Sequence, residues 1–251
     1  NAVNDVTDAI YEKFDHRYGG WGDGAKFAHP EALDFALVQV AKRSDDRMRE
    51  VATLTLDRML ESPIHDQIDG GFFRFSKTND WRNPNFEKLL DSNAKILRAY
   101  IEGYQLFGTT AYRDTAKGIG DWMLKFLKHP KNGAFFGSQD ADADYYNHDR
   151  EGRQQRSPVA VDQTIHCHAN SLAVSGLLKA SVVLDLPEWR EHAMVVLRFL
   201  VEELFALQHL QRRPRHRPGA LPGPSPSADA EHIAVDIQRQ AAERAECRRR
   251  R

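Results

Sequence analysis

The sequence Gly19-Gly20-Trp21 recurs in altered form as Gly70-Gly71-Phe72 and as Gly133-Ala134-Phe135. The copies start 51 and 63 residues apart, and each lies between two segments with helical spacing of apolar residues. A loop with such a period is typical of stacked helix pairs, because each pair buries its apolar face only against the next. One Gly-Gly-aromatic turn would be ordinary turn chemistry. Three in phase with helix pairs predict an all-α repeat.

Seven segments carry apolar residues at the three- and four-residue spacing of a helix. Asn4 can cap the first, Asp45 or Asp46 the third, and Pro84 and Pro187 stand where a first-turn proline opens a helix. No region shows the sustained alternation of a strand. The expected helices cover roughly 4–14, 30–40, 45–59, 84–104, 110–127, 172–182 and 187–204.

The net charge of −1 conceals two different regions. Residues 205–251 contain ten arginines, five acidic residues and no lysine, whereas residues 1–204 carry a net charge of −6. Five prolines within 214–226 prevent a continuous helix. We therefore expect a helical domain over 1–204 and a disordered, Arg/Pro-rich tail over 205–251. The abrupt change of composition favours a non-native end over an arm that binds nucleic acid or a membrane surface.

Composition excludes several classes of protein. The chain has only two cysteines, Cys167 and Cys247, 80 residues apart, so a disulfide scaffold is not expected and a reducing, cytoplasmic location is favoured. No run approaches 18 apolar residues, so no membrane-spanning helix is expected. Residues 1–5 lack the features of a signal peptide and are typical of a sequence that begins within a longer protein.

The densest group of chemically active side chains runs from Asp66 to Asn93. It combines carboxylates, a guanidinium and aromatic rings, the mixture that binds sugar hydroxyls and sugar C–H faces. Glu87 and Asp91 either serve a site or act as first-turn partners of a helix dipole. Asn93 falls on an apolar stripe, so it either contacts a ligand or bonds to the backbone of a neighbouring loop.

A second group is Asp140, Asp142 and Asp144, with Glu151 further along. Its spacing matches a calcium loop superficially, but Tyr145 stands where that loop needs glycine. We therefore predict no metal here; the acids cap a helix, solvate a loop or line a pocket. A glycosidase needs two carboxyl groups roughly 5–10 Å apart, and each of the two acidic groups could supply one.

A third group is His166-Cys167-His168 with Asn170. A histidine here could act as an acid or base, a metal ligand or the partner of a nucleophilic Cys167. The alternative is a helix entry that holds polar residues. No phosphate-binding loop, dinucleotide fingerprint or nucleophile elbow is present, so no cofactor is expected.

These stretches together resemble the DUF255 family of YyaL-like and spermatogenesis-associated protein 20-like proteins. The resemblance covers roughly residues 10–204. Its most specific blocks are Phe86-Glu87-Lys88-Leu89-Leu90 and Gln139-Asp140-Ala141-Asp142. Further matches are Gly19 to Gly22, Ala25 to Phe27, Pro30, Gly70 to Ser76, Asp80-Trp81, Pro84-Asn85, Asp91 to Ala94, Gly137-Ser138 and Pro158 through Asp162 to Asn170.

The resemblance implies an (α/α)6 toroid of the six-hairpin glycosidase type, with a thioredoxin-like domain upstream. A full toroid has about twelve helices, so seven imply a truncated one. Asn85 stands where the family usually has His or Tyr, and Ala169 where it usually has Trp. His166 and His168 also depart from the family pattern.

The leading hypothesis is therefore a carbohydrate-active-enzyme-like domain that hydrolyses or epimerises a sugar. Asp140 or Asp142 would be the acid/base, with Glu87 or Asp80 as its partner. The alternative is a non-catalytic module that acts with a thioredoxin-like redox domain. The expected substrate contacts are Arg74, Trp81, Phe72, Asp91, Asn93, His166 and Asn170.

Overall fold

The computed structural model describes residues 1–205, and the tail for which disorder is expected lies outside the described residues. One unit comprises Asn1–Val196; a second begins at Leu197, and it is described as far as Phe205. Within the described part of the chain, no helix is long and apolar enough to cross a membrane.

Helices dominate the described chain, as expected. The principal ones are α1 (Ala2–Glu12), α2 (Pro30–Arg43), α3 (Asp46–Glu61), α4 (Leu90–Phe107), α5 (Thr110–Trp122), α8 (Cys167–Val183) and α9 (Pro187–Phe199). Short π-helical turns, η1 (Met123–Leu127) and η2 (Leu200–Phe205), follow α5 and α9. Two further short helices are α6 (Ala143–Tyr146) and α7 (Arg150–Gln154). The seven predicted helical segments are confirmed in place, although some of their ends differ.

Helix ends follow the local sequence in most cases. Asp45 caps α3 by accepting bonds from the backbone N–H groups of Arg47 and Met48. Pro187 opens α9 as predicted. The expected cap Asn4 is wrong, because α1 begins earlier and Asn1 caps it.

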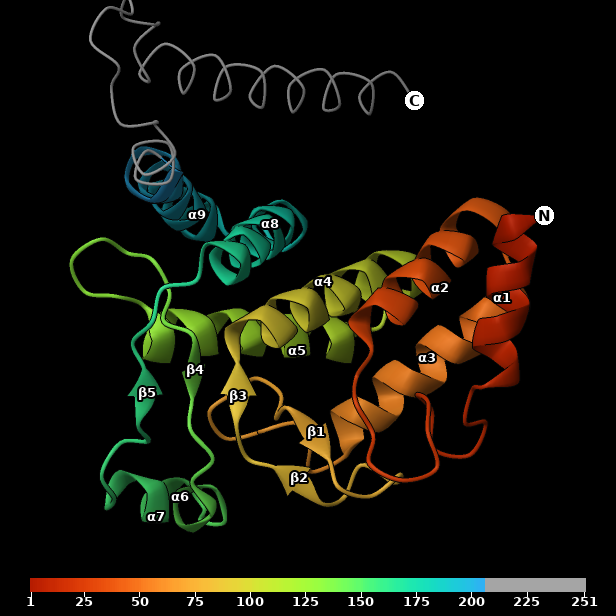
Figure 1. Cartoon of the computed structure of the whole chain (residues 1–251), viewed down its shortest axis with the longest axis horizontal. Helices are drawn as coiled ribbons and strands as arrows, with labels where there is room; N and C mark the ends of the chain where they lie inside the picture. The colour runs from red at the N-terminus through yellow and green to blue at the C-terminus, as the bar shows by residue number, and fades with distance from the viewer. Residues whose placement is uncertain (206–251) are drawn as a thin grey trace, which may run out of the picture. The chain divides into compact units, whose positions relative to one another are not determined.

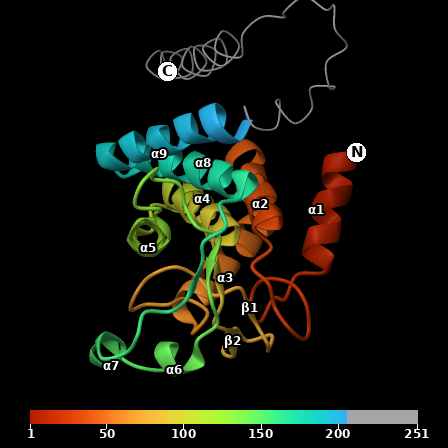
Figure 2. The same cartoon turned by 60° about the vertical axis from the view of Figure 1, so that its left-hand side comes forward.

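The helices form two layers. In one, α4 packs between α2 and α8; α3 and α5 pack against this row (Figures 1 and 2). Leu33 of α2, Leu97 of α4 and Leu177 of α8 are fully buried in the core between them. Each such side chain contributes about 1.5–3 kcal/mol by leaving water. Long loops precede α2, α4 and α8. Most of the chemically active side chains therefore lie at the end of the row where these helices begin.

The three repeated loops share one hydrogen-bond pattern. In each, a residue six positions before the aromatic residue donates its N–H to the carbonyl oxygen of the residue just before that aromatic. The pairs are Asp15 with Gly20, Asp66 with Gly71 and His129 with Ala134, with N···O distances of 2.9, 3.0 and 2.6 Å. The aromatic residue of each loop also forms an antiparallel bridge, to Phe14, His65 or Lys128. The predicted repeat is thus confirmed at the level of the backbone.

A buried lysine fastens two of the three loops. Lys26 Nζ lies 2.6 Å from Asp15 Oδ2 and 2.8 Å from the Gly19 carbonyl oxygen. Lys88 repeats both distances with Asp66 and Gly70. Because each ammonium bonds a carboxylate and a carbonyl of the same loop, it fixes that loop against the segment that carries the lysine, which is β3 for Lys88 and an isolated bridge to Ser76 for Lys26.

Five two-residue strands accompany these loops, too short to leave an alternating sequence pattern. β1 (Phe75–Ser76) pairs with β2 (Pro84–Asn85); β4 (Ser138–Gln139) pairs with both β3 (Lys88–Leu89) and β5 (Val161–Asp162), all antiparallel. All five lie at the same end of the helical layers (Figure 1).

The start of the fourth helix departs from the sequence prediction. Pro84 begins β2, not a helix, and α4 begins at Leu90. Lys88 is drawn into β3 because its side chain reaches Asp66 while its backbone pairs with Gln139. Glu87 therefore precedes the helix, and its interpretation as a first-turn dipole partner is wrong.

Candidate functional site

The sheet of β3, β4 and β5 lies where the loops meet the first turns of two helices. β3 runs directly into α4, and β5 ends shortly before α8 begins at Cys167. Helix N-termini carry partial positive charge and stabilise nearby anions. The side chains of this sheet therefore lie near the positive ends of α4 and α8.

The two faces of this sheet differ. Lys88 and Gln139, which pair across β3 and β4, are both buried. Successive side chains alternate between faces, so the opposite face receives Glu87 and Asp140. The recorded register ends at the pair of Lys88 with Gln139; extended by one residue, it would set Glu87 opposite Asp140. Directly opposed Cβ atoms in antiparallel strands are about 4.5–5.5 Å apart, which suits two cooperating carboxyl groups.

Arg74 holds Glu87 from the side. Its Nη1 lies 2.7 Å from Glu87 Oε2, and its backbone N–H donates to the Glu87 carbonyl oxygen at 2.7 Å. The Arg74 side chain is 49% exposed. It therefore retains N–H groups that can face a ligand while one remains on Glu87.

Asp162 and His166 approach the same sheet from β5 and the start of α8. A Cβ built on Gly137, which precedes β4, would lie 3.3 Å from both Asp162 Oδ2 and His166 Cδ2. Side-chain and backbone hydrogen bonds from Thr164 lower the pKa of Asp162. Sequence reasoning did not select Asp162, although it lies within the family-like block from Pro158 to Asn170.

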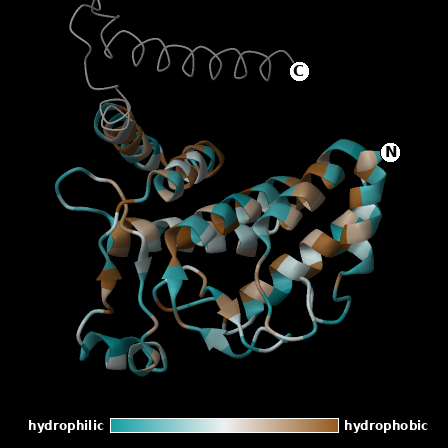
Figure 3. Cartoon of the chain, in the orientation of Figure 1, coloured by the Kyte–Doolittle hydropathy of each residue, from teal (hydrophilic) through white to brown (hydrophobic). Residues whose placement is uncertain are grey.

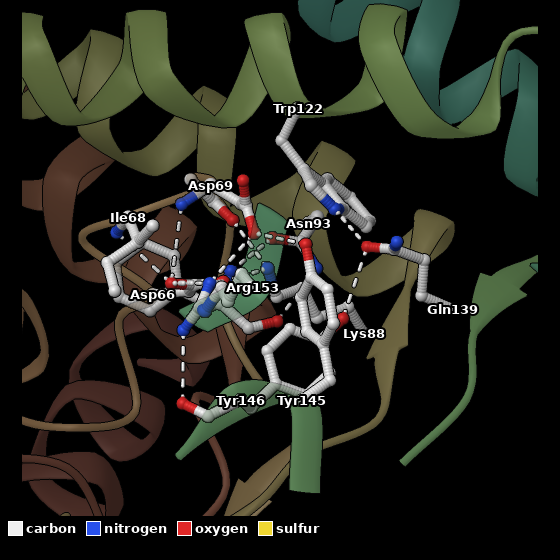
Figure 4. A network of polar contacts seen from close by, with 12 residues as sticks. Asp66, Ile68, Asp69, Lys88, Asn93, Trp122, Gln139, Tyr145, Tyr146 and Arg153 are labelled. Carbon is white, nitrogen blue, oxygen red and sulfur yellow. Dashed lines mark hydrogen bonds and ion pairs between the residues drawn. The ribbon is translucent and has the colours of Figure 1, made fainter. Parts of the chain in front are cut away.

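A network of charged groups fills the buried side of the sheet (Figure 4). Arg153 Nη1 lies 2.9 Å from each carboxylate oxygen of Asp66 and 2.8 Å from Asp69 Oδ2. Asp66 also binds Lys88, and the Lys88 and Asp66 side chains are 0% and 1% exposed. Gln139 accepts hydrogen bonds from the Trp122 indole and the Tyr146 hydroxyl. The network therefore joins β3, which directly follows Glu87, to β4, which directly precedes Asp140.

Arg153 also anchors the segment that contains α6 and α7. Its Nη2 and Nε donate to the carbonyl oxygens of Tyr146 and His148. The ribbon of α6 and α7 is largely hydrophilic (Figure 3). Tyr145 adds a hydroxyl bond to Asp69. Polar contacts to the second repeated loop thus hold this segment in place, together with the packing of the Tyr146 ring on Phe73 and Phe86. Sequence reasoning missed Arg153, Tyr145 and Tyr146 as network members, because their partners are distant in sequence.

Burial and neighbouring charges shift the pKa values of this network in opposite directions. Burial lowers the pKa of Lys88 to about 8, despite the adjacent Asp66. Burial alone would raise the pKa of Asp66, but the charges and hydrogen bonds of Lys88 and Arg153 lower it below its ordinary value of 3.8. Asp66 therefore stabilises the fold fully above that ordinary pKa, and the contribution is lost as pH falls through the lower folded pKa.

We expect the stability advantage of the parent chain over Asp66→Asn to shrink as pH falls below about 4. The reason is that a protonated Asp66 resembles asparagine in charge. Urea unfolding of both chains between pH 6 and pH 3 measures the difference. Asp121→Asn, at an exposed position on α5, is the control and should show little change. A difference for Asp66→Asn that is constant over this range would contradict the assignment.

Four predicted substrate contacts are buried and hold the loops together. Asn93 accepts from the Phe72 N–H at 2.7 Å and donates to the Phe72 carbonyl oxygen at 2.9 Å; Asn170 repeats both bonds with Phe135. The Trp81 indole donates to the Tyr18 carbonyl oxygen. For Asn93, the structure thus shows the backbone-bonding alternative. Phe72, Trp81, Asn93 and Asn170 are at most 1% exposed, so in this arrangement they position backbone and do not face a ligand.

The other predicted carboxylates lie apart from the Glu87–Asp140 pair. Asp80 accepts from Thr78 Oγ1 and the Arg82 N–H in the loop between β1 and β2. Asp142 caps α6 by accepting from the Tyr145 N–H at 2.9 Å. Asp91 lies in the first turn of α4. Asp80 and Asp142 therefore serve a loop and a helix cap, in local structure separate from Glu87 and Asp140.

The remaining predictions concern metal and histidine chemistry. Among residues 1–205, no group of three or more His, Cys, Asp or Glu side chains is placed to hold a metal ion. Asp144 instead pairs with Arg156 at 3.0 Å. His166 occupies the N-cap position of α8 without a side-chain capping bond, and Cys167 and His168 are exposed in its first turn, which confirms the helix entry.

Comparison with known sequences gives relatives over about half of the chain. Over 136 residues the sequence is 35% identical to spermatogenesis-associated protein 20 of Homo sapiens. The chain is homologous to that protein over this region. The match covers 53% of the chain and 17% of the human protein. A similar match, 30% identical over 153 residues, covers 57% of the chain and 21% of an uncharacterised Caenorhabditis elegans protein. These relationships confirm the resemblance inferred from the motifs; no protein-family model matches the chain.

Comparison with solved structures confirms the fold. Cellobiose 2-epimerase from Spirochaeta thermophila superposes with a TM-score of 0.61 at 13% identity, over 79% of this chain and 54% of that one. A D-mannose isomerase gives 0.64 at 12% identity, over 82% and 53%. A family 76 glycoside hydrolase from Bacteroides thetaiotaomicron gives 0.63 at 12% identity, over 80% and 42%. The described chain thus has the six-hairpin glycosidase-like (α/α)6 fold over about half the length of these enzymes.

Proposed function

We propose that the chain is a carbohydrate-active domain whose acid/base pair is Glu87 and Asp140. The observation that carries this proposal is the pairing of Lys88 with Gln139, because the next residue pair on the opposite face is Glu87 and Asp140. The fold likeness to sugar epimerases and a glycoside hydrolase supports a sugar as the ligand.

The two carboxyl groups suit two related reactions. In glycoside hydrolysis one carboxylic acid protonates the leaving oxygen, while a carboxylate roughly 5–10 Å away activates water or attacks the sugar. In epimerisation one group removes a proton from carbon and another returns a proton on the opposite face. Glu87, paired with Arg74, is the carboxylate of the pair. Asp140 takes the role of proton donor in this proposal.

The groups around the pair suit a polyhydroxylated ligand. Arg74 offers N–H donors, Asp162 and Asp91 offer acceptors, and His166 lies beside Asp162 at the start of α8. Charged planar groups bind vicinal hydroxyls well because each can make two directed hydrogen bonds. These four residues are therefore the proposed sugar contacts.

Glu87→Gln and Asp140→Asn are each expected to lower turnover of a responsive sugar by about 100-fold or more, because general acid–base groups contribute about that factor. Cellobiose, D-mannose and mannan oligosaccharides are suitable probes, with product formation and ligand-induced NMR shifts as readouts. Asp121→Asn, on the outer helix α5, should leave turnover unchanged. The proposal fails if the parent chain acts on none of these sugars, or if both site variants match it.

The thioredoxin-like upstream domain and the cytoplasmic location stay predictions from the family resemblance and the cysteine content. A Cys-x-x-Cys motif in sequence preceding residue 1 of the full-length protein would support the alternative role as a redox partner module.

A further inference from the structure

A hollow lies between three segments of the chain, and neither Glu87 nor Asp140 borders it. It measures about 350 Å³ and is bordered by Arg17 and Tyr18, by the end of α3 with Arg58, and by the loop that holds Asp80 and Arg82. Its volume is within the range of small-ligand sites. Three guanidinium groups from separate segments thus border one cavity.

Two of these guanidinium groups are free of carboxylate partners within the described chain. Neither Arg17 nor Arg82 forms an ion pair within residues 1–203, whereas Arg58 makes a long contact of 3.5 Å to Glu61. The Arg17 guanidinium rests over the Tyr18 ring, 4.9 Å from its centroid. Asp80 already accepts bonds from Thr78 Oγ1 and the Arg82 N–H. The border of the cavity therefore has spare cationic donors.

The backbone under the cavity is fixed and strained. Trp81 lies between Asp80 and Arg82, is fully buried and has a φ of +64°, a value rare for a bulky side chain. Its indole N–H donates to the Tyr18 carbonyl oxygen at 2.9 Å. This bond ties the Arg82 segment to the Arg17 segment. Backbone strain of this kind is concentrated at functional sites.

We propose that this cavity binds the phosphate group of a small phosphorylated metabolite, such as a sugar phosphate. Guanidinium groups recognise phosphate oxygens through paired, charge-assisted hydrogen bonds. Trp81 fixes the spacing between the Arg17 and Arg82 segments in advance, so less conformational entropy is lost when a ligand binds. The Tyr18 ring and the carboxylate of Glu61 remain beside the phosphate position for the uncharged part of the ligand.

The test is a titration of the full chain with inorganic phosphate and with glucose 6-phosphate, followed by calorimetry and NMR. We expect saturable binding that weakens by about 10-fold in each of Arg17→Ala and Arg82→Ala, since a bond to a charged group contributes about 1.5–3 kcal/mol. Arg190→Ala is the matched control, because this exposed arginine on α9 also has no ion pair within residues 1–203. It should bind like the parent chain.

Two outcomes would overturn the proposal: no saturation by either probe at millimolar concentration, or equal loss of binding in Arg190→Ala and the two cavity variants. Glu87→Gln should retain phosphate binding, since it lies outside the cavity. The phosphate site can therefore be supported or refuted independently of the proposed sugar chemistry.

Discussion

Arg153→Met is expected to lower the free energy of unfolding by about 3–5 kcal/mol, the cost of removing one partner from a buried ion network. The Arg153 side chain is 6% exposed and lies between Asp66 and Asp69, whose side chains are 1% and 10% exposed. Methionine preserves most of the volume but leaves two carboxylates with only Lys88 and Lys125 nearby. Urea unfolding followed by circular dichroism measures the loss.

Arg150→Met is the matched control on the same short helix. Arg150 is exposed and makes one side-chain bond, to the Ile68 carbonyl oxygen at 3.2 Å. Its replacement should cost less than about 1 kcal/mol, as for a single surface hydrogen bond. Equal losses in the two variants would contradict the assigned role of Arg153.

A double-mutant cycle separates charge from packing. If Asp66 and Arg153 stabilise each other, Asp66→Asn combined with Arg153→Met should cost less than the sum of the single changes. Faster amide exchange in residues 143–154 of Arg153→Met would show that the α6–α7 segment has lost its anchor. Additive losses would mean that the two side chains act independently.

Much of the helical repeat could be predicted because short stretches of sequence determine it. The Gly-Gly-aromatic loops mark the repeats, and Asp45 and Pro187 mark helix starts with short-range chemistry. The start of α4 could not be predicted this way, because a partner far along the chain decides it. Pairing with Gln139 and the ion pair with Asp66 override the local preference at Lys88.

The candidate site shows the same division. The residue types at Glu87 and Asp140 are recognisable in the sequence, but the proposal that they act as a pair depends on the register of β3 and β4, which only the structure supplies. Asn93 and Trp81 have hydrogen-bonding groups that could bind a ligand. Because both side chains are buried, these groups bond to backbone atoms instead. Arg153 lies 87 residues from Asp66 and in no motif, so no local signal could identify it.

Gly70→Ala is expected to destabilise the fold by about 3 kcal/mol or more. Gly70 has a φ of +84°, and an added Cβ would lie 2.3 Å from the carbonyl oxygen of Gly118 in α5. The left-handed backbone costs an alanine about 1–2 kcal/mol, and a clash with backbone adds about 1–3 kcal/mol, since a helix cannot move aside as a side chain can. Urea unfolding measures this loss directly.

Two other glycines separate these contributions. Gly108 has a φ of +70°, but a Cβ there would meet nothing within 4 Å, so Gly108→Ala should show only the backbone cost. Gly118→Ala, within α5, also meets nothing and should stabilise the helix by about 0.5–1 kcal/mol. If Gly70→Ala cost no more than Gly108→Ala, the close packing of the second repeated loop against α5 would be refuted. A clear excess would show that glycine is required there by the contact between two backbones, the same contact that brings Asp66 and Lys88 into the buried network.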